Sequence, residues 1–209
     1  MPRPLTLKIK EIFASVQGEG LRMGRPTLFI RLSGCNLRCS FCDAQSAWEE
    51  GEELSVEDIL SAVDRVRKKL PTEWICLTGG EPLTQNVRPL CENLKKKGYS
   101  IQVETNGTQP LVSSIDWLTL SPKPPDYVIH HACLNQVREV KLVVTRELTE
   151  EIIFDVLKRI PSEAPLFLQP QSMEEWSLRN AERLLRACLK AGPADIRLGL
   201  QLHRLFNIR

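Results

Sequence analysis

Short apolar runs alternate along the chain with stretches in which apolar residues recur every three or four positions. The short runs predict strands, because most of them end at glycine, proline or a polar cluster. They occupy residues 9–16, 27–33, 74–78, 99–104, 116–120, 139–144, 166–170 and 196–200. The helical spacing predicts helices at 55–70, 86–97, 149–158 and 172–190. This alternation favours an α/β fold whose parallel sheet curves into a partial barrel, with the chemistry at the C-terminal ends of the strands.

Polar residues predict where three of the helices begin. Ser55 is expected to be an N-cap, with Asp58 three residues later in an acidic variant of the capping box. Thr149 and Ser172 are expected to begin the last two helices. Because no repeat, low-complexity segment or linker interrupts the pattern, residues 1–209 are expected to form a single domain that ends in a short tail.

The overall composition excludes several classes of protein. Of the 209 residues, 42% are apolar and 26% are charged, and the net charge is +2, as in an ordinary soluble globular protein. This balance gives no electrostatic argument for binding nucleic acid or a membrane surface, and no apolar run approaches the roughly 18 residues of a membrane span. The N-terminus lacks the continuous apolar segment of a signal peptide. Seven cysteines, an odd number, argue against a secreted disulfide framework and favour a reducing cytoplasm.

Three of these cysteines, Cys35, Cys39 and Cys42, lie in one short segment with the spacing C-x-x-x-C-x-x-C. Thiolates are soft ligands, and iron–sulfur clusters are usually held by four of them. Three thiolates from one loop can hold three irons of a [4Fe–4S] cluster and leave the fourth iron open to a second molecule. Gly34 before the loop and Phe41 within it fit a bent ligand loop. Two alternatives remain. One is a zinc site in which a histidine is the fourth ligand, and the other is three cysteines that bind no metal.

Residues suited to ligand binding follow several predicted strands. Residues 17–20 read Gln-Gly-Glu-Gly, which lets the backbone approach a ligand closely, although a plain hairpin turn also explains the glycines. Residues 79–82 read Gly-Gly-Glu-Pro and lie between a strand and a helix, where α/β folds place their sites. Glu104 ends a further strand, and the turn after it does not require a carboxylate.

Arg31 is the anomaly of the apolar strand 27–33. A guanidinium in such a strand needs a partner, and a carboxylate that it meets in bidentate fashion is the best one. The carboxylate of a ligand and that of a protein Asp or Glu both remain possible.

The cysteine loop, with an aromatic residue before its third cysteine, resembles that of the radical S-adenosylmethionine (SAM) superfamily. Residues 78–82 resemble the motif that receives the amino group of SAM in that superfamily. The resemblance implies an incomplete TIM-like barrel of the radical SAM type, with a [4Fe–4S] cluster held by Cys35, Cys39 and Cys42. It also implies that SAM binds the open iron and is cleaved to a 5′-deoxyadenosyl radical.

A closer resemblance, over nearly the whole chain, is to the 7-carboxy-7-deazaguanine synthase family. The matching segments are 17–20, 29–35, 42–43, 78–82, 104–107, 121–123 and 201–203. The resemblance implies a carbon–nitrogen lyase of queuosine and 7-deazapurine biosynthesis, which contracts 6-carboxy-5,6,7,8-tetrahydropterin to 7-carboxy-7-deazaguanine with loss of ammonia. SAM would be recycled and no protein acid or base would be needed. The resemblance further implies a homodimer, reduced by a flavodoxin or ferredoxin, that makes no direct contact with nucleic acid.

The same resemblance implies roles for individual residues. The implied SAM contacts are Phe41, Cys42, Asp43, Gly80, Glu104, Ser121, Pro122, Lys123, Gln169, Pro170, Gln171 and Ser172. The implied substrate contacts are Val16, Gln17, Gly18, Glu19, Arg31, Thr78, His203 and the terminal carboxylate of Arg209. Within these sets Lys123 would meet the methionine carboxylate and Arg31 the substrate carboxylate.

One position departs from the family pattern. Relatives often have a threonine after the Cys-Asp pair, where it contributes to a Mg²⁺ ion that contacts the substrate, and this chain has Ala44 there. Because alanine has no side-chain oxygen, any Mg²⁺ is expected to be held chiefly by water and substrate oxygens. The Mg²⁺ requirement is therefore expected to be weaker than in the relatives that have threonine.

Two other functions remain open at this point. A glycyl-radical activating enzyme would share the cluster loop and a similar size, but it would not need residues 17–20 or an arginine placed for a small carboxylate. A non-catalytic zinc-binding module would need a fourth ligand, which could be His130, His131 or Cys133. The two histidines lie in a polar segment and are predicted to be part of a solvated loop.

Overall fold

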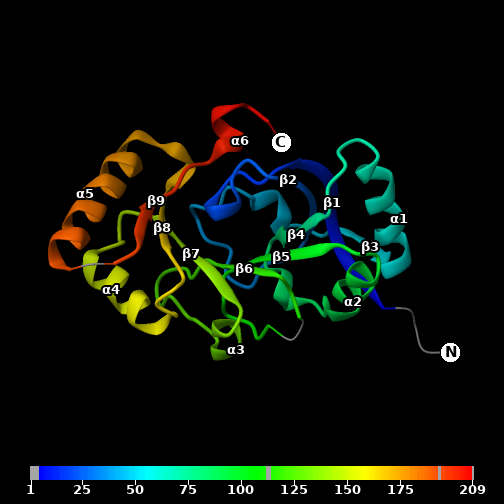
Figure 1. Cartoon of the computed structure of the whole chain (residues 1–209), viewed down its shortest axis with the longest axis horizontal. Coiled ribbons are helices and arrows are strands. Elements are labelled where there is room, and N and C mark those ends of the chain that lie inside the picture. The colour runs from blue at the N-terminus through cyan, green and yellow to red at the C-terminus, as the bar shows by residue number, and fades with distance from the viewer. Residues whose placement is uncertain (1–4, 112–113, 193, 209) are drawn as a thin grey trace.

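A computed structural model describes residues 5–111, 114–192 and 194–208. The strands are β1 (Thr6–Val16), β2 (Pro26–Leu32), β3 (Glu52–Ser55), β4 (Trp74–Gly79), β5 (Ser100–Thr105), β6 (Trp117–Leu120), β7 (Val137–Val144), β8 (Leu166–Pro170) and β9 (Ile196–Leu198). The helices are α1 (Val56–Arg67), α2 (Arg88–Lys96), α3 (His131–Leu134), α4 (Glu150–Arg159), α5 (Glu175–Ala191) and α6 (Leu202–Leu205). Figure 1 shows the strands as a band across the molecule, with α1 and α2 towards one end and α4 and α5 towards the other. Within the described ranges, no helix has both the length and the apolar character that a bilayer crossing requires.

All nine strands belong to one sheet, in the order β3-β1-β2-β4-β5-β6-β7-β8-β9. Neighbouring strands from β2 to β9 are parallel, as predicted. In contrast, β1 is antiparallel to both β2 and β3, so the prediction of a wholly parallel sheet is wrong at this edge. The physical reason is the short connection at residues 17–25, because a parallel return needs a crossover of roughly a dozen residues or more. Strand β3 was not predicted, since its short polar sequence forms a strand only by pairing with the start of β1.

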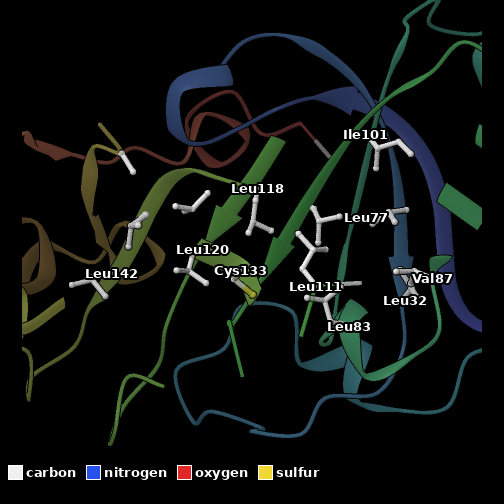
Figure 2. Packing of buried hydrophobic residues seen from close by; sticks show 14 of the residues in the cluster. Leu32, Leu77, Leu83, Val87, Ile101, Leu111, Leu118, Leu120, Cys133 and Leu142 are labelled. Atoms are coloured by element: carbon white, nitrogen blue, oxygen red, sulfur yellow. The ribbon is translucent and has the colours of Figure 1, made fainter. Parts of the chain in front are cut away.

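Alternate residues of the parallel strands point to two different faces of the sheet. One face is apolar and fully buried, and its members include Ile30, Leu77, Val103, Leu120, Leu142 and Leu168. Figure 2 shows Leu77, Leu118, Leu120 and Leu142 among the packed side chains of this core. The residues one position away in each strand are largely polar: Arg31, Thr78, Glu104, Ser121, Lys141 and Gln169. A parallel sheet covered by packing on both faces would be apolar throughout, so the polar face is the one available for chemistry.

Two of the three predicted helix starts are confirmed. The Ser55 hydroxyl accepts a hydrogen bond from the backbone N–H of Asp58 at 3.1 Å, and the Thr149 hydroxyl caps α4. The prediction for Ser172 is wrong, because α5 begins at Glu175 and Ser172 lies in a separate 3-10 turn with φ of 49°. Ser177 in the first turn of α5 ties this 3-10 turn to the helix, because its hydroxyl accepts from the N–H of Gln171 at 2.8 Å.

Smaller differences concern the ends of elements. Strand β1 starts at Thr6 and β7 at Val137, whereas β9 ends at Leu198 and α2 begins at Arg88. The solvated loop predicted around His130 and His131 contains the one-turn helix α3, which begins at His131, and the rings of the two histidines are stacked. Backbone pairing with a neighbouring strand sets such ends, and it leaves little local signal in the sequence.

Candidate active site

A cavity of about 490 Å³ lies at the C-terminal ends of the parallel strands. Every predicted site residue lines it except two. Pro122 is not among the lining residues, and Arg209 lies outside the described part of the chain. The cavity thus joins the cysteine loop, the strand ends and the C-terminal tail in one place.

The three cysteines of the loop are partly exposed on the wall of this cavity, and none forms a disulfide. The backbone N–H of Cys42 donates to the carbonyl of Cys39 at 3.0 Å, which bends the loop. Burial raises the pKa of the Cys39 thiol, and the nearby ammonium of Lys123 acts in the opposite direction. Three soft donors on one wall of a cavity fit an iron–sulfur cluster with three protein ligands.

The loop after β4 is locked to the cysteine loop through backbone contacts. The N–H of Gly80 donates to the carbonyl of Leu32 at 3.0 Å, and that of Glu81 donates to the carbonyl of Gly34 at 2.8 Å. The Glu81 carboxylate is fully buried and accepts from the Thr105 hydroxyl at 2.7 Å and the Asn106 N–H at 2.6 Å. Burial raises the pKa of Glu81, and these hydrogen bonds act against that rise. One buried carboxylate therefore ties the ends of β4 and β5 together.

Gly80→Ala is expected to disturb cluster binding, because an added Cβ would lie 1.8 Å from the Gly34 carbonyl oxygen. Backbone has to move to relieve that contact, at a cost of about 1–3 kcal/mol in unfolding free energy. We expect a Tm lower by several degrees and a reduced iron content after reconstitution. Gly192→Ala is the control, because its Cβ would meet nothing within 4 Å. Equal iron content and Tm in Gly80→Ala and wild type would contradict this prediction.

Arg31 pairs with a protein carboxylate. Its Nε donates to Glu11 Oε1 at 2.8 Å across the β1–β2 pair, and both residues also line the cavity. The side chains are only about a quarter exposed, at 24% and 27%. A guanidinium has five N–H donors, so the bond from Nε leaves donors for a carboxylate in the cavity.

Lys141 was missed by sequence reasoning, although it interrupts an apolar strand together with Arg138 and Glu139. Its ammonium forms an ion pair with Glu19 and lies 3.9 Å from Glu104 Oε2. Burial alone would lower the pKa of Lys141, but the carboxylates of Glu19 and Glu104 raise it well above its ordinary value. Lys141 is therefore a cation on the cavity wall at neutral pH.

Lys123 behaves differently, although it lies in the same cavity. Its ammonium donates to the carbonyl oxygen of Ser121 at 2.6 Å and to the hydroxyl of the same residue. Burial and the neighbouring charge of Lys141 lower the pKa of Lys123 to about 8. An anionic group bound beside Lys123 would favour its charged form.

The C-terminal tail closes one side of the cavity. The backbone N–H of Leu202 donates to the carbonyl of Gly18 at 2.9 Å, and the Gln201 amide donates to Glu19 at 2.8 Å and to Asp43 at 2.9 Å. Glycine at position 18 lets the His203 side chain pack closely, because an added Cβ would lie 2.2 Å from Nδ1 of His203. Gln201 stands in a motif that the sequence singled out, but only His203 was predicted to belong to the site.

Gln169 also lines the cavity, and its side chain has a hydrogen-bond acceptor without a partner among the described residues. Its side-chain Oε1 is buried and has no hydrogen-bond partner in the described part of the chain. Buried acceptors usually have a partner, so this atom fits a wall that hydrogen-bonds a ligand.

Beneath residues 17–20, a second buried cation supports the loop. The guanidinium of Arg22 lies 3.3 Å from the ring centre of Trp74, and burial lowers the pKa of Arg22 to about 10. The neighbouring N–H of Leu21 donates to the buried carboxylate of Glu139 at 2.6 Å. These contacts support the segment after residues 17–20, and none of the four residues lines the cavity or was given a site role from the sequence.

The proposed fourth ligands of a zinc module do not reach the cysteine loop. Neither His130, His131 nor Cys133 is among the residues that line the cavity. Cys133 is fully buried, with its sulfur 3.5 Å from the carbonyl oxygen of Gln109.

Comparison with known proteins agrees with this geometry. The model of the radical SAM superfamily matches residues 29–160. A 7-carboxy-7-deazaguanine synthase from Bacteroides thetaiotaomicron is 39% identical over 207 residues, which cover 97% of this chain and 98% of the relative. The chain belongs to the 7-carboxy-7-deazaguanine synthase family of radical SAM enzymes. The family member from Aquifex aeolicus is 34% identical over 217 residues, covering 97% of this chain and 94% of that protein.

A solved structure supports the same assignment. The crystal structure of QueE from Escherichia coli matches with a TM-score of 0.78 and 29% identity, over 95% of both chains. The predicted fold class, an incomplete TIM-like barrel of the radical SAM type, and the predicted class of enzyme are confirmed. Membership of this family implies a [4Fe–4S] cluster and SAM as cofactors. These matches favour the synthase over both the activating enzyme and the zinc module.

Proposed function

We propose that this protein contracts 6-carboxy-5,6,7,8-tetrahydropterin to 7-carboxy-7-deazaguanine with loss of ammonia, a step in queuosine and 7-deazapurine biosynthesis. The observation that carries the proposal is the composition of a single cavity. Cys35, Cys39 and Cys42 lie on its wall together with Arg31, a cation suited to a small carboxylate. An activating enzyme for a partner protein would not need that cation.

The cofactors account for one part of the cavity. Cys35, Cys39 and Cys42 would hold the cluster, and Lys123 would pair with the methionine carboxylate of SAM. Residues 41–43, Gly80, Glu104, Ser121 and residues 169–172 would supply the remaining SAM contacts. When bound, the cluster and SAM would supply the radical chemistry needed at C6 of the substrate.

The protein's own residues bind and orient the substrate. Arg31 would hold the substrate carboxylate, and residues 16–19 would meet the polar edge of the pterin, where Glu19 offers acceptors to its N–H groups. Thr78, His203 and the terminal carboxylate of Arg209 would complete the site. The C-terminal tail, which is hydrogen-bonded to Gly18, would exclude water from the reacting atoms. The whole chain would form a single domain, with this tail as a cap over the substrate.

The proposed partners follow the same assignment. The protein would form a homodimer and receive electrons from a flavodoxin or ferredoxin. Its seven free cysteines favour a reducing compartment such as the cytoplasm.

The deciding experiment is an anaerobic assay of reconstituted protein with SAM, a strong reductant and 6-carboxytetrahydropterin. Formation of 7-carboxy-7-deazaguanine with many turnovers per SAM is expected. Release of 5′-deoxyadenosine without that product would overturn the substrate assignment and leave the enzyme class intact. Zinc without iron or sulfide in the protein would overturn both.

Activity is expected to depend only weakly on Mg²⁺. Ala44 lines the cavity and has no side-chain oxygen, so this position contributes no ligand to a hydrated ion there. Turnover measured with added Mg²⁺ and with strict chelation should be similar. Ala44→Thr restores an oxygen at this position and is expected to make turnover more dependent on Mg²⁺. A steep Mg²⁺ requirement of the wild-type protein would contradict the prediction.

A further inference from the structure

Lys141 is the only lysine whose ammonium pairs with acidic residues of the cavity, within the described part of the chain. It comes from the middle of β7, and its side chain is 15% exposed. We propose that Lys141 is a positioning residue that fixes the Glu19 carboxylate for the pterin and holds Glu104 in place beside it. This inference rests on the proposed function, because it assigns Glu19 to the substrate.

Each of these two carboxylates is fixed from two directions. One oxygen of Glu19 contacts Lys141, and the other accepts from the Gln201 amide at 2.8 Å. One oxygen of Glu104 lies 3.9 Å from Lys141, and the other accepts from the Gln17 amide at 2.8 Å. An ionised carboxylate has about four acceptor sites, so Glu19 retains sites for the N–H groups of a pterin.

The positive charge of Lys141 counteracts repulsion between the carboxylates of the cavity. Glu19, Glu104 and Asp43 all line the same cavity, and carboxylates crowded in a site of low dielectric repel one another. Lys141 offsets this repulsion. In the described part of the chain Lys123 forms no ion pair with Glu19 or Glu104, and its ammonium donates to Ser121 instead.

The charge state of Lys141 distinguishes a role in positioning the carboxylates from a role as an acid or base. The carboxylates of Glu19 and Glu104 raise its pKa above the ordinary lysine value despite burial, so it keeps its proton at neutral pH. A group that does not release its proton contributes through charge and geometry. Its removal should therefore weaken binding of the pterin and leave the chemical step largely intact.

The test compares Lys141→Met, Lys141→Arg and the control Lys97→Met in the reconstituted holoenzyme. Lys97 forms an exposed ion pair with Asp64, outside the cavity. Lys141→Met is expected to raise the KM for the pterin roughly 10- to 100-fold, the range of a charge-assisted hydrogen bond, with a much smaller change in kcat. Lys141→Arg keeps the charge and should fall between wild type and Lys141→Met. Lys97→Met should match wild type.

Two results would overturn the inference. An unchanged KM in Lys141→Met would show that Glu19 needs no such support, and a fall in kcat at constant KM would place Lys141 in the chemical step. If Lys141→Met shows no cooperative thermal unfolding, Lys141→Arg decides, because displacing the charge should still raise KM several-fold. Failure of the wild-type protein to convert the pterin would instead refute the proposed function, independently of these variants.

Discussion

Cys39→Ser is expected to abolish turnover and to remove most of the bound iron. Three cysteines line the cavity, and a serine hydroxyl is a much weaker ligand for iron than a thiolate. No other cysteine is among the residues that line this cavity, so the loss is not replaced. Iron and sulfide per chain after anaerobic reconstitution, together with product formation, measure the effect.

The control for this prediction is a cysteine with a different environment. Cys91 is buried on α2 and lies in the apolar core, so Cys91→Ala should lower Tm slightly and leave the iron content unchanged. Full iron and full activity in Cys39→Ser would show that the cluster is held by another set of ligands. Loss of iron in both variants would point to unfolding as the cause.

Arg31→Met is expected to lower kcat/KM for the pterin roughly 100-fold or more, mainly through KM. Truncating one partner of a buried, hydrogen-bonded charge pair costs about 2–5 kcal/mol, and 1.4 kcal/mol corresponds to a factor of ten. A methionine side chain is unbranched like that of arginine, but it cannot donate to a carboxylate. Initial rates over a range of pterin concentrations give both constants.

The pairing of Arg31 with Glu11 requires a double variant as control, because Arg31→Met also leaves Glu11 without this partner. The double variant Arg31→Met/Glu11→Gln also removes the negative charge of Glu11. If Arg31 binds the substrate, the double variant should remain as impaired as Arg31→Met. If Arg31 only neutralises Glu11, the double variant should recover most of the wild-type kcat/KM, which would contradict the proposed role.

Most of the fold followed from local signals. The apolar runs located eight of the nine strands, because each is bounded by glycine, proline or polar residues within a few positions. The Ser55 cap was predictable because donor and acceptor are three residues apart. Ser172 is a serine like Ser55 but does not cap a helix. The turn that contains it is held by Ser177, which accepts from the N–H of Gln171 and donates to a backbone carbonyl of β7.

The site was predictable to the extent that its residues lie in contiguous motifs. The cysteine loop, residues 17–20 and residues 78–82 each carry a recognisable pattern, and the structure brings them to one cavity. Lys141 lies outside such a motif, and its partner Glu19 is 122 residues away in the chain. Gln201 joins Glu19 and Asp43 across 182 and 158 residues, which no local pattern encodes.

The sequence by itself determined the order of strands and helices, the ligand loop and the family to which this protein belongs. Each of these depends on the chemistry of residues that are close together in the chain. Only the tertiary structure decided that β1 runs antiparallel, that Arg31 is paired with Glu11 and that Lys141 is shared by carboxylates from distant segments. Such contacts arise when strands pack side by side, and the charge of a buried group is then balanced by whichever residue the fold places next to it.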